Sequence, residues 1–230
     1  DKQRSQNYAK VLREVTMAVR AAGPEPESNF ALKVALQKAR EYNVPKDNVE
    51  KAIKKGSGEG GDDYKEINYE GYGMDGVAIF VEATTNNPTR TIANVRSFFT
   101  KNGGTIGKEG CLQFVFERKA VFTMKDDGLD VDELTLELID AGAEDVESED
   151  GFITVKGAVE SFGDLFKKLE AMQIKVEDSA LERIPLNTKE VNDKDNYDRN
   201  LRLVEMLEGD DDVLKVYHNM EYNESFSGQD

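Results

Sequence analysis

The sequence predicts an α+β fold: an N-terminal three-helix bundle plus two ferredoxin-like α/β domains, the last of which is inserted into the other. Apolar residues recur at every third or fourth position up to about residue 56, and at every second position in several segments after residue 63. A glycine-rich segment, G-S-G-E-G-G-D-D at 56–63, separates the two patterns and reads as a flexible linker. Residues 119–184 follow the order strand, helix, strand, strand, helix, strand, which is the split ferredoxin-like order.

Two amphipathic segments open the predicted bundle. The first helix is expected from residue 2 to about 22, and the second from about 30 to 42, with apolar residues that cover more than one stripe. The G-P-E-P-E-S-N segment between them breaks the helical pattern, and Ser28 or Asn29 can cap the second helix. Short helices joined by short loops predict a small bundle.

The third helix, within residues 43–56, has signals at both ends. Pro45 suits a first helical position, and Gly56 can take the left-handed stop. Val49, Ala52 and Ile53 share one side, so this side is expected to pack inward. The lysines of this helix are then left facing water.

The remaining elements alternate between strands and helices. Strands are expected at 64–72, 77–83, 111–116, 120–124, 145–147, 152–155, 175–184 and 213–218, and helices at 89–101, 131–141, 159–172 and 197–207. The last helix and strand cannot be stable alone, so we expect them to return and complete the earlier sheet. The predicted domains are a basic helical domain (1–60), a discontinuous α/β domain (61–118 plus 186–230) and an inserted ferredoxin-like domain (119–185).

Charge is distributed unevenly along the chain. Lys and Arg against Asp and Glu number 12 against 8 in residues 1–60, 6 against 8 in 61–118 and 12 against 30 in 119–230. A basic N-terminal third joined to an acidic remainder can present one side to nucleic acid and keep the rest away from it. The asymmetry therefore favours an oriented encounter with a polyanion.

Composition also bounds the compartment. A single cysteine, Cys111, excludes an intramolecular disulfide and fits a reducing compartment, so a cytoplasmic location is expected. No apolar run has the length needed to cross a bilayer, and the first residues lack the apolar core of a signal peptide. We expect no membrane partner.

Several motifs have simpler structural interpretations. G-Y-G-M-D-G at 71–76 matches G-x-G-x-x-G, but a strand follows where a phosphate-binding loop must open a helix, so it is interpreted as a hairpin turn. The acidic segment around Glu147 is interpreted as a solvated turn, because Asp150 stands where a calcium loop needs glycine. His218 is the only histidine and is interpreted as a structural residue at a strand end, and Cys111 as a buried, inert thiol. No catalytic residue, metal site or cofactor is predicted.

The basic residues of the first third are the candidate nucleic-acid-binding residues. Their alternative interpretation is an ordinary solvated helix surface, and composition alone favours neither. A basic amphipathic helix can also lie on a membrane, but the apolar stripes here are needed for the bundle core. The candidates are Lys2, Arg4, Lys10, Arg13, Arg20, Lys33, Lys38, Arg40, Lys46, Lys51, Lys54 and Lys55.

A set of motifs, in one order over residues 1 to about 220, resembles the YebC family, which includes the PmpR-type regulators and the mitochondrial translational activator of cytochrome c oxidase. The motifs are V-P-K-D-N-V-E-K-A-I-K-K-G, Y-E-G-Y-G-x-x-G-V-A-I, N-N-x-x-R-T, V-R-x-x-F-x-K-N-G-G and V-Y-H-N. The resemblance implies a helical bundle, a discontinuous α/β domain and an inserted α/β domain. It also implies a DNA-binding transcriptional regulator without enzyme chemistry or a required cofactor, and some members of the family act on the ribosome to relieve stalling.

Three functional hypotheses follow. In the first, a transcriptional regulator binds duplex DNA through the basic bundle, where about six phosphate contacts would give a log-log salt slope near −5. Phosphate contacts do not read sequence, and no predicted helix stands out as a reader lined with Arg, Asn or Gln. In the second, a translation factor uses the same side on ribosomal RNA, where shape and backbone dominate recognition. In the third, an enzyme or small-molecule sensor has its pocket between the α/β domains.

Overall fold

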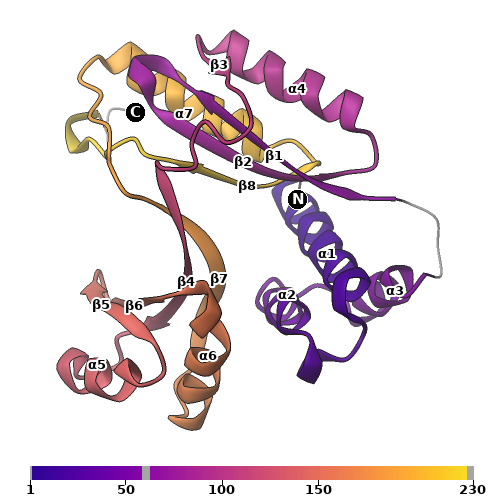
Figure 1. Cartoon of the computed structure of the whole chain (residues 1–230), viewed down its shortest axis with the longest axis vertical. Coiled ribbons are helices and arrows are strands. Elements are labelled where there is room, and N and C mark those ends of the chain that lie inside the picture. Colours follow the sequence, from indigo (N-terminus) through magenta and orange to yellow (C-terminus); the bar gives the residue numbers. More distant parts are fainter. Residues whose placement is uncertain (1, 59–62, 227–230) are drawn as a thin grey trace.

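The computed structural model describes residues 2–58 and 63–226 of the 230-residue chain. It confirms the predicted α+β fold, with a helical region followed by two four-stranded antiparallel sheets. Figure 1 shows the first sheet and its helices at the top, the second sheet with its helices at the lower left and the helical bundle at the lower right.

The bundle contains the three expected helices. They are α1 (Lys2–Ala22), α2 (Phe30–Glu41) and α3 (Lys46–Gly56), with a 3-10 turn, η1 (Pro26–Ser28), before α2. Their core is formed by Val15, Val19 and Leu32 together with small alanines. Asn29 fixes the join between α1 and α2: its side chain accepts from Leu32 N at 3.1 Å and donates to Ala18 O at 2.8 Å. One buried side chain thus caps the start of α2 and binds a carbonyl near the end of α1.

The predicted left-handed stop at Gly56 is wrong. Gly56 is the last residue of α3 and has no positive φ, whereas Gly58 takes φ +100°. A Cβ at Gly56 would lie 2.7 Å from both Thr16 O and Val19 Cβ, so glycine is needed there because α3 passes very close to α1. Residues 59–62 of the predicted linker lie outside the described residues.

The first sheet has the strand order β3-β1-β2-β8. Its elements are β1 (Lys65–Tyr72), β2 (Ala78–Thr85), α4 (Pro88–Lys101), β3 (Thr105–Ile106), α7 (Lys194–Glu208) and β8 (Val213–His218), with 3-10 turns η2 (Met74–Gly76) and η4 (Glu224–Phe226). The motif at 71–76 joins β1 to β2 in an antiparallel hairpin, which confirms its interpretation as a turn. The return of the C-terminal segment is also confirmed, because β8 pairs with β2 and His218 lies opposite Ile79.

The second sheet has the strand order β5-β6-β4-β7. Its elements are β4 (Phe116–Lys125), α5 (Val131–Ile139), β5 (Ala143–Glu149), β6 (Phe152–Gly157), η3 (Val159–Ser161), α6 (Phe162–Ala171) and β7 (Val176–Pro185). This order and connectivity are those of the split ferredoxin-like unit. The first sheet follows a different sequence of elements, with two strands before its first helix.

The strand predicted at 111–116 is wrong, as is the burial of Cys111. Residues 110–115 form consecutive turns, with Cys111 N bonded to Lys108 O and Val115 N to Leu112 O. Leu112 is buried, whereas Phe114 is 80% exposed and Cys111 is exposed. The apolar residues of this run therefore serve a turn anchored at Leu112, and β4 begins only at Phe116.

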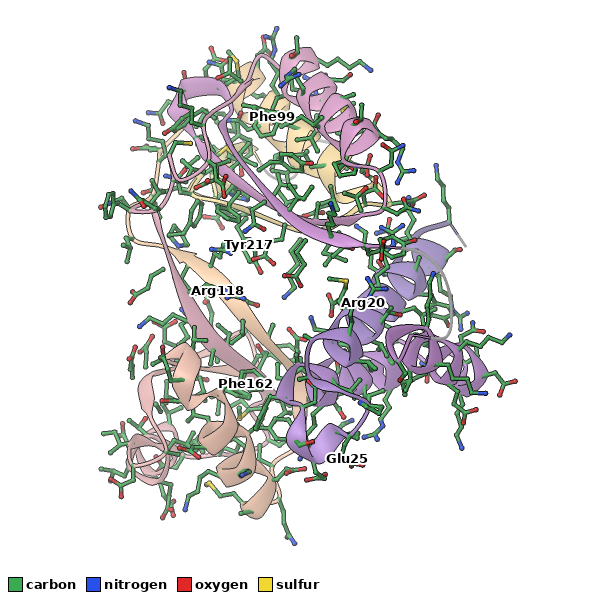
Figure 2. All side chains as sticks on the ribbon, turned by 45° about the vertical axis from the view of Figure 1, so that its right-hand side comes forward. Arg20, Glu25, Phe99, Arg118, Phe162 and Tyr217 are labelled. Atoms are coloured by element: carbon green, nitrogen blue, oxygen red, sulfur yellow. The ribbon has the colours of Figure 1, made fainter. Side chains whose placement is uncertain are left out.

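Contacts among all three parts set their arrangement. The wide apolar surface of α2 has a second role, because Phe30 packs edge-on against Phe162 of α6 with ring centroids 5.8 Å apart. Gly163 permits this approach, since a Cβ there would lie 2.9 Å from the Phe30 ring. Figure 2 shows Phe162 beside the bundle and Arg118 on the strands that lead back toward Tyr217 and the first sheet.

Candidate nucleic-acid interface

The structure divides the predicted cations into outward and inward sets. The outward set is exposed on the helices and contains Lys2, Arg4, Arg20, Arg40, Lys46, Lys51 and Lys54. Lys55 is half-buried, with its ammonium 5.2 Å from the centroid of the Tyr64 ring. The inward set, Lys10, Arg13, Lys33 and Lys38, is only partly accessible and is held by acidic groups or carbonyls of other elements.

The outward set gathers mainly around α3. Lys51 and Lys54 lie three residues apart on the side of α3 opposite Ala52, and neither makes an ion pair with a described residue. Lys46 pairs with Glu50 at 3.8 Å, a weak surface contact. At the far end of α1, Arg20 donates to Tyr64 O at 3.3 Å. The outer side of α3 is therefore the most open cationic surface that the predicted residues form.

Two members of the inward set bind the second sheet and α2. Lys33 lies 3.9 Å from both Glu27 and Glu170. Lys38 pairs with Glu14 at 3.6 Å and has only 12% of its side chain exposed. Burial disfavours the charged form of Lys38, but Glu14 and other neighbours outweigh this effect, so its pKa is raised. These lysines stabilise contacts within the protein.

The other two inward residues attach α1 to the acidic loop 208–212, which follows α7. Lys10 donates to Glu208 O and Arg13 to Asp211 O, while Gln6 donates to Gly209 O at 2.8 Å. The carbonyls at a helix C-terminus carry partial negative charge, which makes them suitable acceptors for cations. Burial lowers the pKa of Lys10, with nearby acidic residues opposing the shift. The loop thus occupies cations that the sequence assigned to phosphate.

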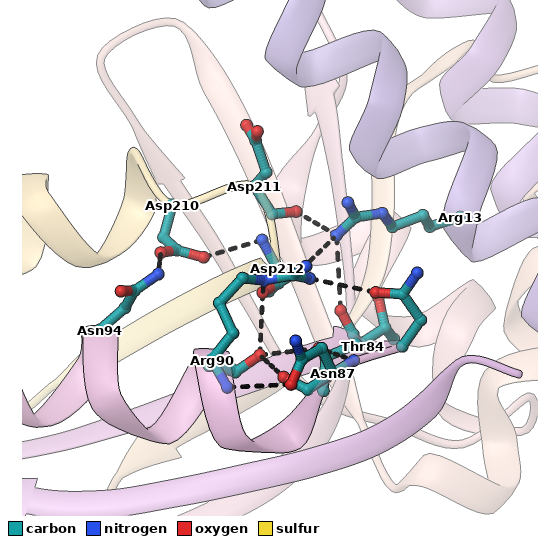
Figure 3. Close-up of polar contacts among 11 residues, drawn as sticks. Arg13, Thr84, Asn87, Arg90, Asn94, Asp210, Asp211 and Asp212 are labelled. Carbon is teal, nitrogen blue, oxygen red and sulfur yellow. Dashed lines mark hydrogen bonds and ion pairs between the residues drawn. The ribbon is translucent and has the colours of Figure 1, made fainter. Parts of the chain in front are cut away.

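A buried carboxylate forms the centre of this attachment (Figure 3). Asp212 accepts from Arg90 Nη2 at 2.9 Å, from Arg90 Nε at 3.1 Å and from Thr91 Oγ1 at 2.8 Å, and it lies 3.5 Å from Arg13. Its side chain is 3% exposed. The hydrogen bond to Asp212 raises the pKa of Arg90. We call Asp212, Arg13, Arg90 and Thr91 the Asp212 clamp, and it joins α1, α4 and β8.

Sequence reasoning missed Arg90 and Asp212. Arg90 stands in the N-N-x-x-R-T motif, which was a usable signal. Asp212 is the last of three consecutive aspartates, and nothing in the sequence distinguishes the buried one. Asp210 accepts from Asn94 at 3.2 Å and Asp211 is exposed, so three identical neighbours have three different environments.

A cavity of about 710 Å³ lies where the bundle meets both sheets. Its walls include Met17, Phe30 and Leu181 as apolar groups and Glu82, Arg118 and Lys215 as charged groups. Burial, followed by the charge of Lys38, lowers the pKa of Lys215. Glu82 is already bound to Arg183 at 2.8 Å. The cavity carries charges of both signs, so it does not define one class of ligand.

Metal and membrane sites were also sought in the structure. Across residues 2–58 and 63–226, no three side chains among His, Cys, Asp and Glu are placed to share a metal ion. None of the helices described in those ranges has the length and apolar character needed to span a bilayer.

Similar proteins identify the family. The family described as "TACO1/YebC second and third domain" matches residues 64–220, and the "TACO1/YebC protein N-terminal domain" matches residues 1–59. A "Probable transcriptional regulatory protein" of Parabacteroides distasonis is 43% identical over 219 residues, covering 95% of this chain and 90% of that protein. A protein with the same description from Porphyromonas gingivalis is 43% identical over 218 residues, with 94% and 90% covered.

A solved structure agrees with this assignment. The crystal structure of a conserved hypothetical protein from Aquifex aeolicus superposes with a TM-score of 0.89 at 36% sequence identity, covering 100% of this chain and 95% of that one. Both the helical region and the two sheets are included in this match. The chain belongs to the TACO1/YebC family.

Proposed function

We propose that this protein is a nucleic-acid-binding regulator of gene expression, and specifically a DNA-binding transcriptional regulator. The descriptions of relatives 43% identical over most of the chain support this choice over a ribosome-associated translation factor. The structural observation that carries it is the open cationic side of α3, formed by Lys51 and Lys54. The proposal assigns the protein no catalytic step and places it in the cytoplasm.

In this proposal the bundle, residues 1–60, is the phosphate-binding domain. The discontinuous domain (61–118 plus 186–230) and the inserted domain (119–185) carry most of the acidic residues, so they keep the polyanion on the bundle side. The proposed phosphate contacts are the outward set and Lys55. Lys10, Arg13, Lys33 and Lys38 act within the protein in the conformation described above.

The decisive experiment compares two nucleic-acid partners at near-physiological salt. Affinity for promoter DNA is measured by fluorescence anisotropy, and association with ribosomes by cosedimentation. Submicromolar, sequence-dependent binding to DNA without cosedimentation supports the proposal. Cosedimentation without DNA binding refutes it in favour of a translation factor.

A charge reversal tests the surface itself. Lys51→Glu combined with Lys54→Glu is expected to weaken DNA binding at least about tenfold and to make the salt slope shallower by about 1.8, or 0.9 for each lost phosphate contact. Lys167→Glu combined with Lys175→Glu is the matched control, because it changes the net charge equally at exposed positions of the inserted domain. Equal effects of the two pairs would show that only net charge matters and that α3 is not the binding surface.

A further inference from the structure

We infer that α4 forms a second contact with duplex DNA, through Arg96 and Lys101 on its outer side. This inference rests on the proposed function and adds the element that would read the groove. Residues 83–108 contain no aspartate or glutamate, although one residue in five of the whole chain is acidic. This stretch of 26 residues includes Arg90, Arg96, Lys101 and Lys108. It spans α4 and the following β3.

The outer side of α4 is free of carboxylates. Thr91, Val95 and Phe99 are buried against the first sheet, while Arg96, Thr100 and Lys101 are exposed. Thr89 and Ala93 extend the exposed stripe toward the start of the helix, at the three-and-four spacing of one face. Each of the other described α-helices carries at least one aspartate or glutamate. In a protein of net charge −16, such a surface offers phosphate an approach without local repulsion.

The cations of α4 are available for binding. Arg90 is engaged by Asp212, but Arg96 and Lys101 make no ion pair with any residue of the described ranges. Short Thr, Ser and Ala side chains surround them, so a partner can come close to the helix backbone. A solvated helix surface in so acidic a chain would be expected to include carboxylates as well, and α4 has none.

The Asp212 clamp fixes α4 relative to the bundle. Arg13 of α1 and Arg90 of α4 meet the same carboxylate, at 3.5 Å and 2.9 Å. In Figure 1 α4 and α3 both lie on the right-hand side of the molecule, above and below the start of α1. The clamp therefore holds two cationic surfaces in one orientation, so that one duplex can meet both.

The dimensions and side chains of α4 fit a duplex. Its 14 residues give a helix of about 21 Å, and the major groove of B-DNA admits an α-helix. Arginine is the commonest bidentate partner of guanine, and the methyl groups of Thr and Ala can contact that of thymine. Phosphate contacts from α3 would position the protein, while Arg96 would contact base edges. The partner is thus duplex DNA with a sequence preference set by α4.

The test uses the full chain and labelled duplexes of about three helical turns, selected by the wild-type protein from a random pool. Arg96→Glu combined with Lys101→Glu is expected to weaken binding at least about tenfold and to reduce the salt slope by up to about 1.8. Arg96→Ala alone is expected to relax the sequence preference recovered in a new selection, with binding to unselected DNA nearly unchanged. Because both side chains are exposed, the variants should melt at the wild-type temperature, which circular dichroism checks.

The charge-matched control is again Lys167→Glu combined with Lys175→Glu. If the α4 pair binds as tightly as this control, or if Arg96→Ala recovers the wild-type preference, α4 is not a DNA contact and the inference is overturned. Loss of binding on reversal of Lys51 and Lys54 would then leave the proposed function standing without it. A wild-type protein that selects no duplex at all would overturn both.

Discussion

Replacing Asp212 by alanine should destabilise the protein more than any neighbouring acidic substitution. Removing one partner of a buried ion pair typically costs about 3–5 kcal/mol. Asp212 accepts three hydrogen bonds in a site where its side chain is 3% exposed. Because 45% of the Arg90 side chain is exposed, its guanidinium can recover solvation after the change. We therefore expect a loss near the lower end, about 3 kcal/mol.

The chain contains no tryptophan, so the free energy of unfolding is best followed by circular dichroism in urea. Asp211→Ala is the control, because the Asp211 carboxylate is exposed and it is the carbonyl that accepts from Arg13. This variant should change the free energy of unfolding by less than about 0.5 kcal/mol. A double-mutant cycle with Arg90→Ala should give a coupling of about 0.5–3 kcal/mol. If the two aspartate variants unfold within about 1 kcal/mol of each other, the clamp does not stabilise the fold as argued.

Two further predictions concern packing and pH. Gly56→Ala should lower the free energy of unfolding by about 1–3 kcal/mol through overpacking between α3 and α1, whereas Gly209→Ala, where the nearest atom would be 3.4 Å from the new Cβ, should have little effect in the same urea titration; equal losses would contradict the close approach. Burial lowers the pKa of His218 below its usual 6.5, so the unfolded chain binds the proton more readily. The stability linked to a neutral His218 is complete above pH 6.5 and is lost as the pH falls toward the lowered pKa, and the wild-type advantage over His218→Gln should narrow accordingly between pH 7.5 and pH 5; a constant difference would refute this linkage.

The fold was largely predictable because most elements carry their own boundaries. Asn29 and Gly103 mark helix ends in the sequence, and the change of apolar period after residue 63 marks the first hairpin. The segment 111–116 failed because its apolar residues serve a turn anchored by Leu112 and leave Phe114 in solvent. Gly56 failed because its reason lies across the bundle, at Thr16 and Val19. A local pattern records what a residue does within its own element, and not which distant backbone approaches it.

The same limit applied to the candidate site. Helical periodicity correctly placed Lys10 and Arg13 outside the bundle core, but it could not show that another part of the chain covers this side of α1. Lys51 and Lys54 remain open because no element packs over the outer side of α3 among the described residues. Counting charges along the sequence overlooked the acid-free stretch 83–108, since averaging over 61–118 hides it.

The pairing of β2 with β8 has a consequence for synthesis. Ile79 and Val81 must wait for His218 and Val216, because the whole second sheet is translated between them. Until then the outer edge of β2 exposes unpaired N–H and C=O groups, to which a strand from another nascent chain could add. Gly209 and Asp211, which hold α1, emerge just as late. A polypeptide halted before residue 208 would thus own all its lysine-bearing helices and still lack the means to orient them.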